Sequence, residues 1–394
     1  MREVAEVALG EVAEFVRGVT FKPDDVTPPG APDTVVCMRT KNVQGTLDTS
    51  DVLSVPRSVV KRSAQYLKAG DTLVSSANSW NLVGKCCWVP AAERPLTFGG
   101  FISVLRADPS LVDQRYLYRW FSSPRIQQVV RTFGRRTTSI SNLDLQRCRK
   151  LPFPLSPLDE QRRIARVLDG ADALRARRRG AIENFAQLQK AAFLEVFGDP
   201  ITNPKGWPMG ALASLGELDR GVSKHRPRNS PHLLGGPYPL VQTGDVARAG
   251  GRIRGWSSTY SEAGITQSRM WPAGTLCITI AANIAHAAIL DFDACFPDSV
   301  VGFVADAATT QYVRVWLSLR RSSIEASASE SAQKNINLRI LRGMQLPIPP
   351  ASVRDPFLVT VSMLERIYDV QRAQAAHLDA LFASLQHRAF AGEV

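Results

Sequence analysis

The hydrophobic pattern of the chain is dominated by one stretch, residues 151–198, in which apolar positions recur every three or four residues. They are Ile164, Leu168, Ala171, Leu174, Ile182, Phe185, Leu188, Ala192 and Val196. This spacing places them on one face of an α-helix. Ser156 and Pro157 are typical of a helix start and Gly198 of a helix end. The pattern predicts one helix of about forty residues, roughly 60 Å long, which needs a partner of similar length.

A second apolar stripe of similar length lies at residues 353–391. Its positions are Leu358, Val361, Leu364, Ile367, Ala375, Leu378, Leu381 and Leu385. Because pairing the two stripes along their length buries both, we expect the two helices to pack against each other. Antiparallel pairing would place the segments that precede them at opposite ends of a helical rod. Gly170 and Gly180 mark where the first helix is most easily kinked.

The segment before the first long helix alternates strand-like runs with turn signals. The runs are residues 34–40, 71–77, 85–90 and 101–107, each bounded by Gly, Pro, Asn or Asp. A helix over 111–121 and a second one capped by Ser123 and Pro124 follow. A basic, polar loop at 132–142 then leads back towards the long helix.

The same succession of patterns begins again after Gly198, at an offset of roughly 200 residues. The matching pairs are 17–23 with 220–227, 38–46 with 241–250, 66–79 with 270–283, 97–108 with 295–306, 115–123 with 311–319, 137–145 with 332–340, and 150–157 with 345–352. We therefore predict an α+β fold in which two pseudo-symmetric α/β domains are held apart by two long antiparallel helices. The predicted domains are residues 1–150 and 199–350, and the helical segments are 151–198 and 351–394.

Composition narrows the function classes. A formal net charge of +12 and a pI near 9.7 favour a polyanionic partner, although an Arg-rich composition also occurs in GC-rich genomes. Six cysteines without C-x-x-C or Cys/His spacing indicate buried thiols in a reducing compartment. No apolar run reaches the length of a membrane span, and the acidic residues of segment 1–15 are unlike a signal peptide, so we expect a cytoplasmic protein.

Catalytic motifs are absent from the sequence. It contains no phosphate-binding glycine loop, no N-P-P-F/Y or D-P-P-Y tetrapeptide and no nuclease-like carboxylate cluster. Asp291 and Asp293 are a candidate metal pair, but the first copy has no clear acidic equivalents, which favours solvated turn carboxylates. Asp159 and Glu160 lie at a helix start, where they complement the helix dipole. We expect a non-catalytic chain with no metal and no cofactor of its own.

The start of the long helix carries a family signature. Its residues are Leu151, Pro152, Pro154, Glu160, Gln161, Ile164 and Ala165. With the helix that follows, this block resembles the central conserved region of the specificity (S) subunits of type I restriction-modification systems, the HsdS family. The resemblance covers the whole chain. The second copy keeps Leu346, Pro347 and Pro349 but has Arg354 and Asp355 where Glu and Gln would be expected.

The resemblance implies a DNA-reading subunit without catalysis. In this family two target recognition domains each read one half of a bipartite, asymmetric site in double-stranded DNA, and the helices set the spacer. Two modification (methyltransferase) subunits bring S-adenosylmethionine to the target adenines, and restriction (translocase and nuclease) subunits join where present. An alternative keeps the fold but makes the chain a DNA-binding adaptor of another defence or regulatory system, or a homodimer.

Loops that recur in both copies are the best candidates for DNA contacts, because Arg, Lys, Ser and Thr position phosphates and Asn and Gln read base edges. In the first domain the candidates are Arg17, Thr20, Lys22, Arg39, Lys41, Asn42, Ser76, Asn78, Arg135, Arg136, Thr137 and Ser139. In the second they are Lys224, His225, Arg226, Gln242, Thr243, Asp245, Arg248, Asn283, Ser331, Gln333 and Lys334. Arg135, Arg136 and Lys334 are favoured, because each lies in a Gly/Ser/Thr-rich loop before the final strand of its domain.

Two further features have competing interpretations. Trp120 and Trp316 recur at matching helical positions, which favours a core or partner contact over base stacking. The run RARRR at 175–179 interrupts the apolar stripe. It is either a solvated or partner-facing stretch, or a basic patch over the spacer phosphates.

Overall fold

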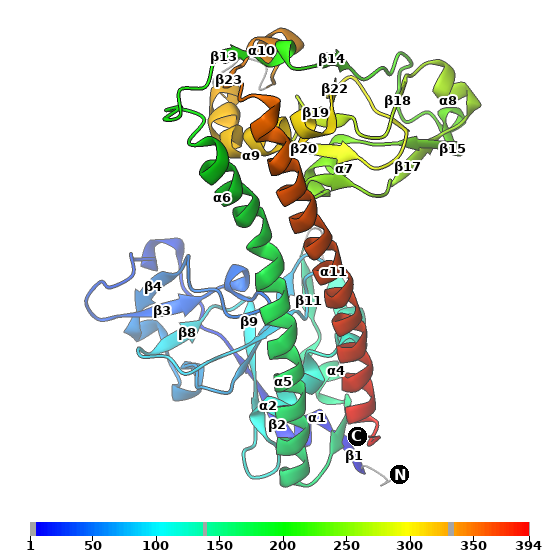
Figure 1. Cartoon of the computed structure of the whole chain (residues 1–394). Helices are drawn as coiled ribbons and strands as arrows, with labels where there is room; N and C mark the ends of the chain where they lie inside the picture. Colours follow the sequence, from blue (N-terminus) through cyan, green and yellow to red (C-terminus); the bar gives the residue numbers. More distant parts are fainter. Residues whose placement is uncertain (1–4, 137–139, 330–334, 394) are drawn as a thin grey trace. The chain divides into compact units, whose positions relative to one another are not determined.

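The computed structural model describes residues 5–136, 140–329 and 335–393, and the chain divides into two compact units (Figure 1). Unit 1 comprises residues 1–178 and 374–394, and unit 2 comprises residues 179–373. Each unit therefore combines one α/β domain with a part of both long helical segments.

Unit 1 is built on an antiparallel four-stranded sheet in the order β2-β9-β5-β7. The strands of the unit are β1 (Ala5–Ala8), β2 (Ala13–Arg17), β3 (Thr34–Met38), β4 (Leu53–Pro56), β5 (Thr72–Ser75), β6 (Ala77–Asn78), β7 (Cys86–Trp88), β8 (Leu96–Phe98), β9 (Ile102–Ala107), β10 (Gly134–Arg136), β11 (Ser141–Leu143) and β12 (Pro152–Leu155). Its helices are α1 (Leu9–Val12), α2 (Gln114–Phe121), α3 (Pro124–Thr132) and α4 (Leu145–Arg149), with 3-10 turns η1 (Pro23–Asp25), η2 (Thr40–Asn42), η3 (Arg57–Val59) and η4 (Ser63–Gln65). The predicted strands and both predicted helices are confirmed.

Unit 2 repeats this plan with the sheet β14-β22-β19-β20-β16. Its strands are β13 (Met209–Ala211), β14 (Glu217–Arg220), β15 (Leu234–Leu240), β16 (Arg252–Ile253), β17 (Ser258–Tyr260), β18 (Met270–Trp271), β19 (Leu276–Thr279), β20 (Ala287–Leu290), β21 (Ala294–Cys295), β22 (Val300–Val304) and β23 (Gln345–Pro347). Its shorter helical elements are η5 (Leu212–Ser214), η6 (Pro231–Leu233), α7 (Thr243–Arg248), α8 (Glu262–Thr266) and α10 (Leu338–Gly343), and α9 (Ala307–Ser329) is one helix where unit 1 has α2 and α3.

The shared Arg-Gly-Val sequence has a structural cause. Gly18 and Gly221 end equivalent strands, and each donates its amide to a carbonyl of the neighbouring strand, that of Ile102 or Val300. A Cβ at Gly18 would lie 2.3 Å from the Gly99 carbonyl oxygen, and one at Gly221 would lie 2.2 Å from that of Phe296. The repeat therefore preserves a close approach of two backbones that only glycine permits.

The structure pairs the two copies differently from the sequence match of Leu151-Pro152 with Leu346-Pro347. Tyr116 donates its hydroxyl to the Pro154 carbonyl at 2.9 Å, and Tyr312 donates to the Pro347 carbonyl at 2.6 Å. Likewise, Leu9 donates its amide to Leu151 and Leu212 donates to Met344. The structural counterpart of Leu151 is thus Met344 and not Leu346, so the predicted pairing of 150–157 with 345–352 is two residues out of register.

This register explains the departure from the family motif. Gln161 is fully buried, accepts the Asp113 amide at 2.8 Å, and donates to the carbonyls of Leu111 and Ser156 at 3.0 and 2.7 Å. Arg354 occupies the equivalent place and donates to the Thr309 hydroxyl at 2.6 Å. Both side chains fasten the start of a long helix to its domain, so Arg354 replaces Gln161 in the same task.

The first long segment is two helices, α5 (Leu158–Glu183) and α6 (Phe185–Phe197), which corrects the prediction of one continuous helix. Asn184 separates them with helix-like dihedrals, φ −69° and ψ −13°, and still donates its amide to Gly180 at 3.1 Å. Gly180 and Asn184 are weak helix formers, so the interruption falls where the chain holds the helix least. The predicted final helix is confirmed as α11 (Ala351–Phe390).

The two helical segments pack against each other within each unit. In unit 1 the first turns of α5, with Ile164 and Leu168, share a core with Phe382 and Ala389 near the end of α11. In unit 2 the rings of Phe193 and Phe357 lie 5.9 Å apart. The Phe185 and Tyr368 rings lie 4.9 Å apart in the same unit, so α6 and α11 run antiparallel there.

Candidate nucleic-acid interface

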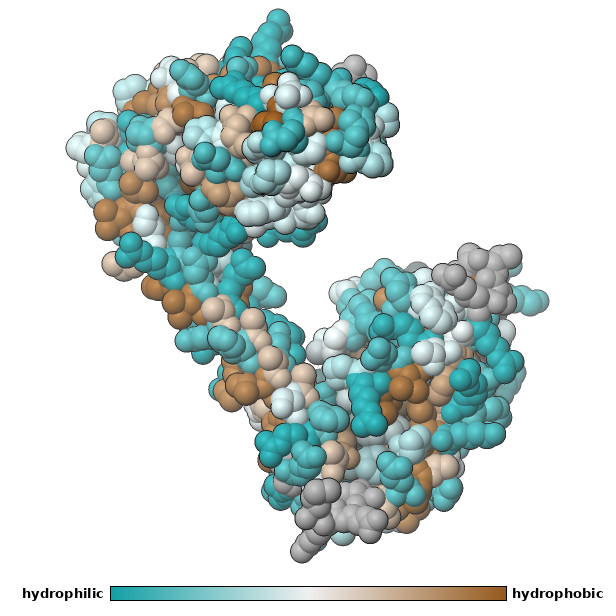
Figure 2. All heavy atoms as spheres, turned by 90° about the vertical axis from the view of Figure 1, so that its right-hand side faces the viewer, coloured by the Kyte–Doolittle hydropathy of each residue, from teal (hydrophilic) through white to brown (hydrophobic). Residues whose placement is uncertain are grey.

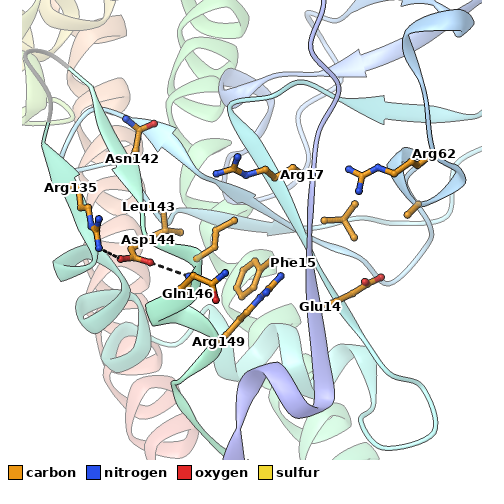
Figure 3. Close-up of a pocket in the computed structure, with 13 residues that line it drawn as sticks. Glu14, Phe15, Arg17, Arg62, Arg135, Asn142, Leu143, Asp144, Gln146 and Arg149 are labelled. Atoms are coloured by element: carbon orange, nitrogen blue, oxygen red, sulfur yellow. Dashed lines mark hydrogen bonds and ion pairs between the residues drawn. The ribbon is translucent and has the colours of Figure 1, made fainter.

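A basic pocket of about 640 Å³ lies on the surface of unit 1. Arg17, Arg62, Arg135 and Arg149 line it, together with Glu14 and other side chains shown in Figure 3. These arginines come from β2, the residue before η4, β10 and α4, four segments that are distant in the sequence. The pocket therefore gathers cationic groups that only the folded domain brings together.

Gln65 fixes the backbone at the edge of this pocket. Its side chain is buried and donates to the carbonyls of Arg17 and Gly18, at 3.4 and 3.2 Å. Its amide oxygen accepts the backbone amides of Lys61 and Arg62, at 3.1 and 3.2 Å. A single side chain thus ties the end of β2 to the segment that carries Arg62.

Arg135 is held by a carboxylate. It donates to Asp144 at 2.5 Å, and Asp144 also caps α4 by accepting the Gln146 and Arg147 amides. The Arg147 amide, and then the charge of Arg135, lower the pKa of Asp144. The guanidinium remains largely exposed. Arg135 and Arg136 lie in strand β10, paired with β11, which corrects the prediction that they belong to a loop.

The remaining candidates of unit 1 divide into exposed and internal side chains. Thr20 and Lys22 are exposed, whereas Ser76 and Asn78 are half-buried. Arg39 and Lys41 both pair with Asp51. Asn42 is buried, accepts the Arg39 amide at 2.7 Å and donates to the carbonyls of Asp48 and Asp51. The side-chain amide of Asn42 is therefore hydrogen-bonded within its own loop, and its contact with DNA stays a prediction.

In unit 2 a second pocket, of about 390 Å³, lies beside the predicted loops. Gln242, Thr243 and Arg228 line it, with Ala281 and Ala282. The segment 282–285 holds three non-glycine residues in the left-handed region, Ala282 (φ 46°), Asn283 (φ 52°) and Ala285 (φ 58°). Such strain is sustained only where the surroundings enforce it, and it concentrates at functional sites. Asn283 is exposed on this segment.

The basic loop that follows β14 is partly neutralised. Arg226 and Arg228 both pair with Asp298, and Arg226 also donates to the Ser223 carbonyl at 2.5 Å. His225 donates its backbone amide to the Gln267 side chain at 2.9 Å. Lys224 is exposed beside them.

Asp245 has an internal role that matches that of Asn42. It accepts the Gln242 amide at 2.9 Å, pairs with Arg248 at 2.9 Å and accepts the Ser257 hydroxyl at 3.0 Å. The resemblance between segments 38–46 and 241–250 therefore reflects a capped turn that recurs in both domains. Asp245 thus caps a turn, and its contact with DNA stays a prediction.

Several predicted residues lie outside the described part of the chain, namely Thr137, Ser139, Ser331, Gln333 and Lys334. Conversely, sequence reasoning missed Arg62, Arg149 and Arg228. Arg149 could have been found, because the second copy has Arg342 at the matching position of its short helix.

The structure also tests the interpretations of Trp120, Trp316 and the RARRR run. Trp120 and Trp316 are 3% and 2% exposed within the two cores, which confirms the core reading. Arg175 of the RARRR run is mostly buried between Asp172 and Asp379, which argues against a fully solvated stretch. Asp291 pairs with Arg252 and Arg254.

The described residues contain neither a metal-binding cluster nor a membrane-spanning helix. Within the ranges 5–136, 140–329 and 335–393, no three His, Cys, Asp or Glu side chains gather as a metal site. None of the helices in those ranges is long and apolar enough to cross a membrane. All six cysteines are unpaired, and burial raises the pKa of Cys37 and Cys87 to about 12.

The fold defines a class of protein, a chain of two repeated α/β domains on paired helices, with a basic pocket on the first domain. The model of the type I restriction modification DNA specificity domain matches residues 1–184 and again residues 204–385. The chain therefore belongs to this family. The matching description confirms the role of a DNA-sequence specificity chain, and the adaptor alternative is not favoured.

Known relatives agree with this assignment. The type I restriction enzyme EcoKI specificity subunit of Escherichia coli (strain K12) is 22% identical over 420 residues, covering 97% of this chain and 87% of the relative. The StySPI specificity subunit of Salmonella potsdam is 25% identical over 191 residues, covering 47% of this chain and 40% of the relative.

Two solved structures share the fold. A chain from a structure of the type I R-M system, concerned with complex assembly and conformational transition, has a TM-score of 0.60 at 16% identity and covers 100% of this chain and 99% of that chain. The type I restriction-modification S subunit from M. genitalium has a TM-score of 0.56 at 14% identity, covering 99% and 97%.

Proposed function

We propose that the chain is the non-catalytic specificity subunit of a type I restriction-modification complex that methylates adenine. Each recognition domain, residues 1–150 and 199–350, reads one half of a bipartite, asymmetric site in double-stranded DNA. The helical segments 151–198 and 351–394 set the spacer between the halves. The observation that carries this proposal is the family match over both copies, together with the basic pocket of unit 1.

The exposed candidates supply the DNA contacts in this proposal. Arg17, Arg135 and Lys224 contact phosphates, and Gln242 and Asn283 reach base edges, because amide side chains can both donate to and accept from a base. Thr20, Lys22, Arg136 and Thr243 lie on the same segments and help to hold the DNA backbone in this proposal. The net charge of +12 accelerates the encounter with DNA and makes it sensitive to salt.

The partners are two modification subunits, which carry the S-adenosylmethionine and the chemistry, and restriction subunits where the system has them. An apolar stripe on α11 supports such docking, because Val359, Met363, Ile367 and Val370 follow helical spacing and are 48–64% exposed. Figure 2 shows hydrophobic side chains at the surface of the helical segments. The complex acts in the cytoplasm.

Methylation mapping tests the function directly. Genomic adenine methylation is compared between cells with and without this gene, and the expected result is the loss of one bipartite motif. The purified chain, incubated alone with labelled S-adenosylmethionine and DNA, should transfer no methyl group, whereas the complex with its modification subunits should do so. Methyl transfer by the chain alone, or an unchanged methylation pattern, would overturn the proposal.

A further inference from the structure

We propose that the basic pocket of unit 1 binds one phosphate of the DNA backbone through Arg17, Arg62 and Arg149, and that on the counterpart face of unit 2 Asp219 engages Arg342 and so withholds it from DNA. The inference deepens the proposed function and rests on it. Its consequence is that the two domains hold DNA unequally, with unit 1 contributing a salt-sensitive contact that unit 2 does not match.

Arg17, Arg62 and Arg149 each have an exposed guanidinium group. All three side chains are exposed and line one pocket, and within the described ranges none of them makes an ion pair with a carboxylate. Arg135, the fourth arginine of the pocket, differs because Asp144 holds it. Glu14 and Asp144 also line the pocket, but they are fewer than its four arginines, so the guanidinium groups still repel one another and a bound anion relieves that repulsion.

The pocket is built on a rigid frame. Phe15 on β2 is buried and lines the pocket from the core side. Gln65 fastens the carbonyls of Arg17 and Gly18 to the amide of Arg62. The cationic groups therefore start from backbone positions that are fixed before DNA arrives, which reduces the ordering cost of binding.

Unit 2 has counterparts for two of these arginines. Arg220 ends β14 as Arg17 ends β2, since Gly18 and Gly221 make the same strand contact directly after them. Arg342 lies in α10 where Arg149 lies in α4, since Met344 and Leu151 accept equivalent amides two residues later.

Part of the charge on the unit 2 face is compensated by a carboxylate of the same face. Asp219 pairs with Arg269 at 3.2 Å and lies 3.7 Å from Arg342. Arg342 also donates to the Leu218 carbonyl at 2.6 Å. At the position of Asp219, opposite the neighbouring strand, unit 1 has Val16, which is buried in the core. The unit 2 face therefore has a carboxylate 3.7 Å from Arg342, whereas no described carboxylate of unit 1 pairs with Arg149.

The salt dependence of binding tests this assignment. The full chain is titrated with a random-sequence duplex over a range of salt concentrations, as wild type and as the variants Arg62→Ala, Arg149→Ala and Arg342→Ala. The slope of log K against log salt is negative, and the loss of one phosphate contact makes it shallower by about one. The affinity gap between wild type and variant should then shrink by about 3.5-fold to fourfold for a fourfold rise in salt.

We expect this shallower slope for Arg62→Ala and Arg149→Ala and an unchanged slope for Arg342→Ala. Asp219→Asn should make the slope steeper by releasing Arg269 and Arg342. Inorganic phosphate should compete only weakly, since a free anion lacks the rest of the duplex, whereas equal competition by phosphate would show a small-anion site instead. If all variants bind the duplex with the same salt slope, the assignment of a phosphate to this pocket is refuted while the proposed function stands. If the wild-type chain does not bind the duplex at all, the proposed function is overturned as well.

Discussion

Removing the Glu365 carboxylate should destabilise unit 2 more than any exposed ion pair in the unit. Glu365 lies on α11 and accepts from Arg252 at 2.6 Å, from Gln311 at 3.1 Å and from Arg314 at 3.1 Å. Arg314 also donates to Gln189 of α6 at 3.2 Å. The side chains of Arg314 and Glu365 are only 6% and 10% exposed, so this network joins the domain to both helical segments away from water.

The magnitude follows from burial. Burial lowers the pKa of Arg314, and the Glu365 charge opposes that effect. Glu365→Ala would leave a buried guanidinium without a carboxylate, and breaking a buried pair in this way costs about 3–5 kcal/mol. For a unit of this size, that corresponds to a fall in Tm of roughly 6–20 °C. Arg252 keeps Asp291 as a second partner, so it contributes less to the loss.

Thermal unfolding of the full chain, followed by calorimetry, is the assay. The matched control is Asp369→Ala on the same helix, whose pair with Arg254 is partly exposed and worth about 1 kcal/mol or less. The double variant Arg314→Met with Glu365→Leu should recover much of the loss, because apolar replacement of a buried pair is often neutral. A Tm for Glu365→Ala equal to that of the control would refute the reasoning.

Three further predictions test other parts of the fold. Gln161→Ala should destabilise unit 1 by about 1–3 kcal/mol, because the Asp113 amide loses its acceptor, whereas the exposed Arg162→Ala should change unfolding little. The folded-state pKa of Asp144 is depressed, so its contribution is complete above about pH 4 and is lost as the pH falls further; the difference in Tm between wild type and Asp144→Asn should vanish in acid. Cys37 and Cys87 should react with a thiol reagent in denaturant but only slowly in the native chain, and fast native labelling would contradict their burial.

Local signals predicted the secondary structure because they depend on neighbours in the sequence. Ser123 and Pro124 begin α3 as expected, and the Ser123 hydroxyl accepts the Ile126 amide. The spacing of apolar residues gave α11 within two residues at its start. The recurrence of the same patterns after Gly198 revealed two copies of one domain, and the match of the family model to both copies confirms it.

Candidate DNA contacts were harder to predict because polar residues in turns have two uses. Asn42 and Asp245 recur in the two copies, and recurrence suggested a shared binding role. In the structure both cap a turn, since the same backbone amide must be satisfied in each copy. A sequence shows that a polar residue stands in a turn, but the hydrogen bonds of the fold decide whether its side chain is available.

The sequence by itself determined the final long helix, the strands of the first domain, the repeat and the family, because periodicity, caps and motifs are properties of adjacent residues, but it did not show that the first long segment is divided at Asn184. Only the tertiary structure decided the register in which Leu151 corresponds to Met344, since that register depends on hydrogen bonds between distant strands. It also decided that Arg17, Arg62 and Arg149 share one pocket and that Glu365 holds Arg314. These pairings join residues far apart in the chain, and their charge and burial exist only once the domains have folded.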